Sequence, residues 1–143
     1  MSRRGIEPRR IPSDRRCPIE PTPPRYPGRA PIEAYGNGGF RFAGMSHRGS
    51  LLCLADAIVG WSATTAEGLT LDDLVPLRDE PSGIELLLLG TGRSFLLPSA
   101  ELRAGLRDIG IRVEPMDTGA ACRTYNILLA EQRSVGAALI AVD

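Results

Sequence analysis

Apolar and polar residues alternate with a short period in the part of the chain that follows residue 30. Segments 32–35 and 40–42 have the spacing of strands, and the glycine-rich stretch 36–39 between them indicates a tight hairpin turn. Two more apolar stretches, 51–54 and 57–61, predict further strands separated by a bend. This part of the chain therefore predicts a small antiparallel meander.

The pattern changes in the second half, where continuous apolar runs alternate with helical spacing. The runs over 84–89, 111–114 and 135–142 predict buried strands. A succession of strand, helix, strand, helix and strand implies right-handed parallel crossovers. The sequence therefore predicts the α/β class with a mixed sheet.

Three helices are predicted from their caps and from apolar positions three or four residues apart. The first covers 71–77 with Thr70 as its cap. The second begins at Pro98, ends at Gly110 and has Leu102, Leu106 and Ile109 on one face. The third is capped by Asp117 or Thr118, ends near Glu131 and has Ala121, Tyr125, Leu128 and Leu129 on its inner face. We expect the second and third helices to be the crossovers between the parallel strands.

Composition excludes several classes of protein. All 17 basic residues are arginine, and a chain without lysine cannot be a phosphate-loop NTPase, a protein kinase or a Schiff-base enzyme. No apolar run approaches the roughly 18 to 20 residues that span a bilayer, which excludes an integral membrane protein. We therefore expect membrane association only through a partner or through a basic segment.

The net charge of zero conceals two unlike segments. Residues 1–29 carry eight arginines against three acids and seven prolines, whereas the remainder is net negative by five. Such a segment cannot bury enough apolar surface to offset the entropy of ordering. We predict a disordered Arg/Pro-rich tail over 1–30, with neither a secretion signal nor a presequence, and a single domain over 31–143.

The first candidate site is the turn Gly90-Thr91-Gly92-Arg93. It leaves the C-terminal end of a buried strand, where open α/β sheets place their ligand crevices, and two glycines let a backbone approach a ligand closely. A dinucleotide fingerprint needs a third glycine where this chain has Phe95, so the turn is not a Rossmann signature. The alternative is a plain turn that needs positive φ angles.

The second candidate site is the segment 116–123, which leaves the next parallel strand and opens a helix whose free N–H groups could hold an anion. Its candidate binding residues are Asp117, Thr118, Cys122, Arg123 and Asn126. Capping is the alternative role for Asp117 and Thr118, and burial is the alternative for Cys122. Arg123 and Asn126 share a helical face. They could form a polar strip with Arg93, or an internal network that ties helix to strand.

Other chemistry is scarce. His47 is the only histidine, and it falls in a predicted turn over 46–49 without an assignable partner. Cys17, Cys53 and Cys122 lack paired C-x-x-C spacing, so we expect no structural zinc, and an odd cysteine count with apolar neighbours fits a reducing compartment. We expect no cofactor and no catalytic constellation.

The chain resembles a family of small domains of uncharacterised function that includes the mitochondrial complex I assembly factor 3 proteins and short bacterial and archaeal relatives. The resemblance covers roughly residues 32–142. It is carried by Ile32-Glu33-Ala34-Tyr35-Gly36, Gly39-Phe40, Gly49-Ser50-Leu51-Leu52, Trp61, Gly90-Thr91-Gly92, Met116-Asp117-Thr118, Ala121, Arg123-Thr124-Tyr125-Asn126-Ile127-Leu128 and Glu131. One departure is Gln132, where family members often have glycine; a left-handed helix end there costs about 1 kcal/mol more than with glycine.

The resemblance implies a three-layer α/β domain with a single curved mixed sheet. It also implies a role in assembling membrane respiratory complexes, and it brings no catalytic residues. Our first hypothesis is a non-enzymatic module, cytoplasmic or peripheral at the inner membrane, that binds an inner-membrane respiratory or insertion subunit and no DNA.

Two alternatives stay open at this point. One is a small-molecule or anion-binding protein or enzyme that uses Gly90 to Arg93 and the helix start at Asp117 and Thr118. The other makes the basic tail an RNA-binding arm, with a steep salt dependence that disappears when residues 1–29 are deleted.

Overall fold

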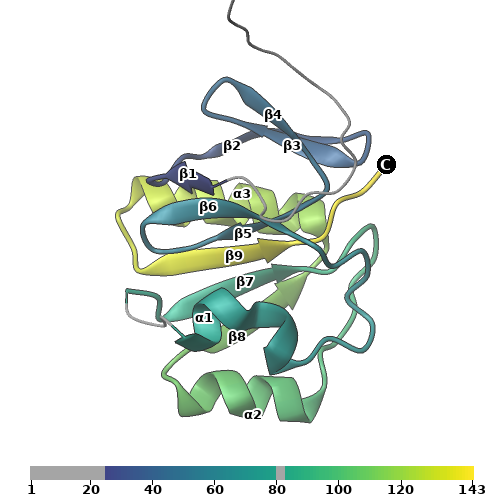
Figure 1. Ribbon diagram of the computed structural model, residues 1–143, viewed down its shortest axis with the longest axis vertical. Helices are drawn as coiled ribbons and strands as arrows, with labels where there is room; N and C mark the ends of the chain where they lie inside the picture. The colour runs from purple at the N-terminus through teal and green to yellow at the C-terminus, as the bar shows by residue number, and fades with distance from the viewer. Residues whose placement is uncertain (1–24, 80–82) are drawn as a thin grey trace, which may run out of the picture.

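The computed structural model describes residues 25–79 and 83–143, and its main feature is a six-stranded mixed sheet (Figure 1). In spatial order the strands are β1 (Arg25–Pro27), β6 (Ala57–Trp61), β5 (Ser50–Cys53), β9 (Val135–Leu139), β7 (Leu86–Gly90) and β8 (Arg112–Met116). Pairing is antiparallel from β1 to β9 and parallel from β9 through β7 to β8. The predicted α/β class, mixed sheet and parallel strands are confirmed.

The first part of the predicted meander forms a second sheet of its own, from β2 (Ile32–Gly36), β3 (Gly39–Phe42) and β4 (Met45–Arg48), whereas its later strands β5 and β6 belong to the large sheet. The prediction of one sheet is corrected here, because the chain turns away at Gly49, whose φ is +98°, before β5 joins the large sheet. The hairpin predicted between β2 and β3 is present, with Asn37 and Gly38 at φ +53° and +78°.

Strand β4 covers residues 46–48 of the turn predicted over 46–49, so that prediction is wrong except at Gly49. The chain reverses earlier, at Ala43 and Gly44, whose φ angles are +50° and +74°. Alanine rarely adopts such a conformation, so the sequence gives little sign of this turn. His47 is consequently a strand residue paired with Phe40 of β3.

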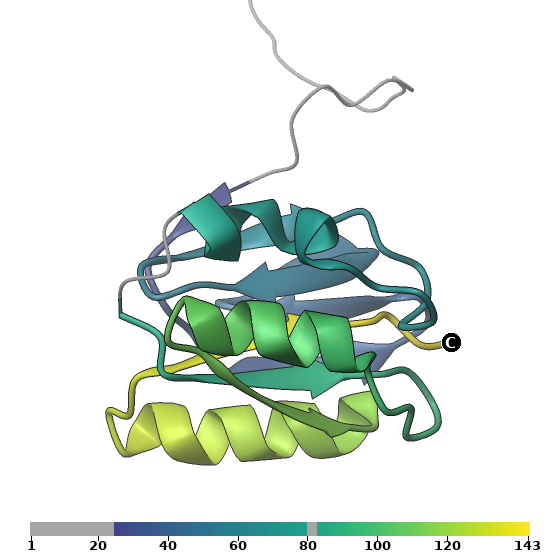
Figure 2. The ribbon, with the colours of Figure 1, turned by 90° about the horizontal axis from the view of Figure 1, so that it is seen from below.

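Helices cover both faces of the large sheet, which makes the predicted three layers. The 3₁₀ helix η1 (Leu71–Leu74), α1 (Val75–Asp79) and α2 (Ala100–Asp108) pack on one face. Helix α3 (Thr118–Ala130) and the small sheet pack on the other. In Figure 2, α1 and α3 lie on opposite sides of the strands.

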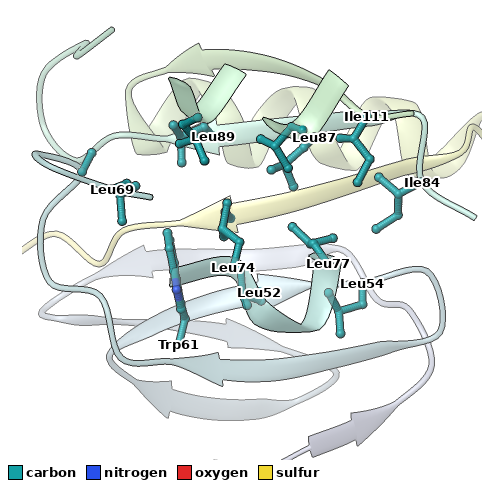
Figure 3. Packing of buried hydrophobic residues seen from close by; sticks show 14 of the residues in the cluster. Leu52, Leu54, Trp61, Leu69, Leu74, Leu77, Ile84, Leu87, Leu89 and Ile111 are labelled. Carbon is teal, nitrogen blue, oxygen red and sulfur yellow. The ribbon is translucent and has the colours of Figure 1, made fainter. Parts of the chain in front are cut away.

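Each face of the sheet has its own hydrophobic core. Figure 3 shows the core under η1, α1 and α2, where Leu74, Leu77 and Leu87 are fully buried. Trp61 closes this core at one side, and its indole N–H donates to the Asp73 carbonyl at 2.8 Å. The opposite core joins Phe40 and Phe42 of the small sheet to Tyr125 of α3.

The helix ends follow local capping chemistry. The sequence predicts that the second helix begins at Pro98, but α2 begins at Ala100. Its cap is Ser99, whose hydroxyl accepts from the Leu102 N–H at 3.0 Å. At the other end Gly110 has φ +84°, as predicted for the helix end. Asp117 caps α3 through a 2.9 Å bond from the Ala120 N–H.

The folded part of the chain begins before the predicted boundary at residue 31. Strand β1 pairs with β6, Ala30 is buried, and the Arg29 guanidinium donates to the Arg133 carbonyl at 3.0 Å. The composition of 1–29 hides this strand because its prolines and arginines dominate the average. The remainder of the predicted tail, residues 1–24, lies outside the described residues.

Candidate functional site

The turn after β7 brings three elements together at one edge of the sheet. A Cβ on Gly90 would lie 3.1 Å from the Cα of Thr118 and 3.1 Å from Leu139, so glycine here lets α3 start directly against the strand. Gly92 has φ +108° and open space around it, so it serves the turn itself. The two glycines thus have packing and turn roles.

Thr118 holds this junction together. It is fully buried, and its hydroxyl donates to the Ile140 carbonyl at 2.7 Å while accepting from the Gly92 N–H at 3.0 Å. Its own N–H donates to the Gly92 carbonyl at 2.8 Å. Thr118 therefore ties the ends of β7, α3 and β9, and its buried hydroxyl has no free hydrogen to donate to a ligand.

Asn126 binds the backbone of β2 as a neighbouring strand would. Its amide accepts from the Ile32 N–H and donates to the Ile32 carbonyl, each at 2.8 Å. Arg93 instead donates to the Asp143 carbonyl at 3.0 Å, and Arg123 is exposed. The alternatives for this face were a polar strip with Arg93 and an internal network that ties helix to strand. The hydrogen bonds of Asn126 favour the network.

The two described cysteines are buried thiols. Burial raises the pKa of Cys122 and that of Cys53 to about 12 each. Burial likewise raises the pKa of the neighbouring Tyr125 hydroxyl. Near neutral pH these groups are protonated, so neither cysteine supplies the thiolate that nucleophilic chemistry requires.

A hollow of about 270 Å³ joins the two predicted loops. Gly92, Arg93 and Asp117 line it, so the two candidate loops meet at one edge of the sheet. Four further residues complete the lining: Tyr35, Gly119, Val142 and Asp143. Sequence reasoning missed Tyr35 because β2 reaches this edge from far along the chain. A Cβ on Gly119 would collide with the Tyr35 hydroxyl.

The helix N-terminus beside this hollow has little left to offer an anion. The Thr118 N–H bonds to Gly92, the Ala120 N–H bonds to the Asp117 carboxylate, and the Ala121 N–H bonds to the Asp117 carbonyl. An incoming anion would also meet the Asp117 carboxylate. The geometry thus favours capping over anion binding for this helix start.

The loop that follows the turn exposes three successive apolar side chains. Phe95 and Leu97 are 59% and 58% exposed, and Leu96 is 39% exposed. The backbone beneath them is held by Thr91, whose hydroxyl donates to the Ser94 carbonyl at 2.6 Å and accepts from the Leu96 N–H at 3.1 Å. We call residues 95–97 the apolar loop. Its adjacent Phe and Leu residues are a signal that sequence reasoning overlooked.

His47 is half-buried, and its Nε2 lies 3.1 Å from the Ser50 carbonyl. Burial lowers the pKa of this imidazole, with the bond to Ser50 acting in the opposite direction. Within residues 25–79 and 83–143, no group of three or more His, Cys, Asp or Glu side chains could hold a metal ion. In the same part of the chain, no helix has the length and apolar character to cross a membrane.

These features define a three-layer α/β domain with an exposed apolar loop at one edge of its sheet. The chain belongs to the family described as "Protein of unknown function (DUF498/DUF598)", whose model matches residues 32–140. The matched range covers all the helices and every strand of the described residues except β1.

Named relatives and a solved structure agree with this membership. An uncharacterised protein of Rhodobacter capsulatus is 42% identical over 85% of this chain and 93% of its own length. The human NADH dehydrogenase [ubiquinone] 1 alpha subcomplex assembly factor 3 is 36% identical over 76% of this chain. The chain spans 59% of that human protein's length. A crystal structure described as an outer membrane protein from Bartonella henselae has a TM-score of 0.79 at 51% identity, covering 82% of this chain and 99% of that one.

Proposed function

We propose that this chain is a non-enzymatic protein-interaction module that assists assembly of a respiratory NADH dehydrogenase complex. The observation that carries the proposal is the 36% identity between this chain and a human assembly factor of that complex, over 76% of this chain and 59% of the assembly factor. The absence of a metal cluster and the high thiol pKa values among the described residues give no support to a catalytic role. The proposed activity is therefore binding.

The apolar loop is the proposed contact surface. Phe95 and Leu97 expose most of their side chains to water, yet Thr91 fixes the backbone that carries them. An ordered apolar loop loses little entropy on binding and gains from burying its side chains. Such a loop suits an unassembled subunit whose own apolar surface has not yet been covered by its final neighbours.

The proposed partner is a subunit at the inner membrane, and the proposed location is the cytoplasmic face of that membrane. In this proposal the chain reaches the membrane through its partner, helped by attraction between the Arg-rich residues 1–29 and anionic lipid. The body of the chain carries net negative charge, which gives it no general attraction for nucleic acid.

A deletion strain of the native host tests the assembly role. We expect native gels of its membranes to show less complete NADH dehydrogenase and more partial complexes, and we expect the intact gene to restore assembly. A gene carrying Phe95→Ser and Leu97→Ser should fail to restore it although the protein accumulates. Normal assembly in the deletion strain would contradict the proposal.

The rival function, an anion or small-molecule site at the hollow beside Gly92 and Asp117, stays a prediction. Its test is a thermal-shift panel of anions and nucleotides on the native chain and on a variant with Gly92→Ala and Arg93→Ala. Ligand stabilisation that the variant lacks would support a site there. The absence of any shift would remove this alternative.

A further inference from the structure

A second hollow, far from the sheet edge described above, is lined by three arginines. It has a volume of about 670 Å³ and lies between α2 and the start of β8, at the end of the molecule where Figure 1 shows these two elements. Its lining consists of Arg103, Arg107, Arg112, Glu85, Gly110, Ile111 and Val113. The volume is in the range of small-molecule sites.

The charge of this lining is not neutralised from within. Glu85 is its one carboxylate, and none of the three guanidinium groups forms an ion pair within residues 25–79 and 83–143. The acids of α2, Glu101 and Asp108, do not line the hollow. The side chains around it therefore present a net charge of two positive units.

Arg103 adds the observation that points to a ligand. Its Nε is buried and has no hydrogen-bond partner among the described residues. A buried donor without a partner is costly, and native structures rarely leave one unless something else binds it. Because Arg103 and Arg107 are one helical turn apart, both guanidinium groups can address one anion.

The neighbouring strand edge argues against an extended peptide as the occupant. β8 is the last strand of the sheet, and its Arg112 N–H points inward to the Glu85 carbonyl at 2.9 Å. Because backbone N–H groups alternate in direction along a strand, positions 113 and 115 are the ones that face outward, and Pro115 has no N–H to donate. An added strand would find few donors, so recognition falls to the arginine side chains.

We propose that Arg103, Arg107 and Arg112 bind a phosphate group carried by a larger molecule. A carboxylate has two oxygens, whereas a phosphate offers three or more acceptors and a double charge, which match three guanidinium groups and the net charge of the hollow. The volume beyond one phosphate, with Val113 and Ile111 beside it, accommodates an attached organic part. Its source is either a soluble phosphorylated compound or a lipid headgroup.

Amide NMR on the full chain locates the site directly. We expect pyrophosphate to shift the amide signals of Gly110, Arg112 and Val113 and to raise the thermal midpoint. Shifts confined to residues 1–24, or to the hollow beside Gly92 and Asp117, would overturn the proposal. Vesicles of phosphatidylcholine with and without phosphatidic acid form the second arm. If vesicles with phosphatidic acid perturb the same amides and pure phosphatidylcholine vesicles do not, the phosphate is assigned to lipid. If pyrophosphate shifts these amides and neither kind of vesicle does, the phosphate is assigned to a soluble compound.

Matched variants separate this site from general charge. Replacement of Arg103, Arg107 and Arg112 by Gln should weaken pyrophosphate binding by about tenfold or more, since charge-assisted hydrogen bonds are lost. The control, Arg25, Arg48 and Arg133 to Gln, removes equal charge elsewhere and should bind as the native chain does. If the triple variant is poorly folded, the exposed pair Arg107→Gln and Arg112→Gln gives the same comparison. Equal binding by the site variant and the control would refute the proposal.

Discussion

Two helices of this chain end in the same backbone motif with different residues at its critical position. After α2, the Gly110 N–H bonds to the Arg107 carbonyl and the Ile111 N–H bonds to the Leu106 carbonyl. After α3, the Gln132 N–H bonds to the Leu129 carbonyl and the Arg133 N–H bonds to the Leu128 carbonyl. Both are Schellman ends, and Gln132 adopts φ +60° where glycine is usual.

This difference predicts the effect of Gln132→Gly. A non-glycine residue in the left-handed region is strained, so the variant should be more stable by about 0.5 to 1 kcal/mol after the greater freedom of glycine in the unfolded chain is counted. Urea unfolding measures the change. As a control, Gly110→Ala should lower the free energy of unfolding by a similar amount. A Gln132→Gly chain less stable than the native one would contradict this account of the helix end.

His47 predicts a pH dependence of stability. Its pKa is lower in the folded chain than the ordinary 6.5, so the unfolded chain binds the proton more readily as the pH falls below that value. The contribution of this group to stability is therefore complete above the unfolded pKa and decreases as the medium becomes acidic. Between about pH 7.5 and pH 5.5, the thermal midpoint of His47→Asn should fall less than that of the native chain. Equal falls would show that His47 does not contribute.

Sequence reasoning at this scale succeeds where the partner is local. Asp117 and Gly110 were predicted from chemistry within one helical turn, and both have those roles. Asn126 could not be decided between two roles because its partner, Ile32, is 94 residues away. The departure at Gln132 was visible only beside the family's usual glycine.

At the scale of elements, strands with strong apolar runs were predicted and weak ones were missed. β7 and β9 are buried on both faces and read as continuous apolar segments. β4 and β1 contain mostly polar, basic or proline residues, and they form because a neighbouring strand offers them hydrogen bonds. The separation into two sheets depends on Gly49, one residue whose conformation the pattern does not specify.

The hydroxyl of Thr91 forms hydrogen bonds to the backbone of the loop after β7. Thr91→Val keeps the shape of the side chain but removes the bonds of its hydroxyl to Ser94, Leu96 and the Met116 carbonyl, so the apolar loop should become more mobile while the core is unchanged. We expect about fivefold weaker partner binding, since a hydrogen bond contributes about 1 kcal/mol net. Amide hydrogen exchange and a binding assay measure the two effects.

Thr91→Ser retains the hydroxyl and is the matched control for this loop. It should bind the partner nearly as the native chain does. Undiminished binding by Thr91→Val, with faster exchange at Leu96, would show that order in the loop does not matter for recognition.

At the scale of the whole molecule, the apolar pattern of the sequence predicted the fold but did not predict the two surface features, the apolar loop and the arginine hollow. Apolar periodicity and caps are sufficient for the α/β class because burial is averaged over many residues. The apolar loop and the arginine hollow each depend on where a few side chains reach the surface, and the apolar pattern does not specify this. The two predicted loops did meet at one sheet edge, because the C-terminal ends of parallel strands share that edge.

The most direct test of the proposed function is quantitative capture of NADH dehydrogenase subunits from detergent-solubilised membranes of the native host. The bait is the full chain, compared with a variant carrying Phe95→Ser and Leu97→Ser. The control carries Ile127→Ser and Met45→Ser, because Ile127 is 60% exposed and Met45 is 43% exposed outside the loop.

We expect the native chain and the control to capture the same respiratory subunits, and the loop variant to capture about tenfold less, since two anchoring apolar side chains are lost. Equal capture by all three would place the contact elsewhere. Failure of the native chain to enrich any subunit of the complex would contradict the assembly role itself.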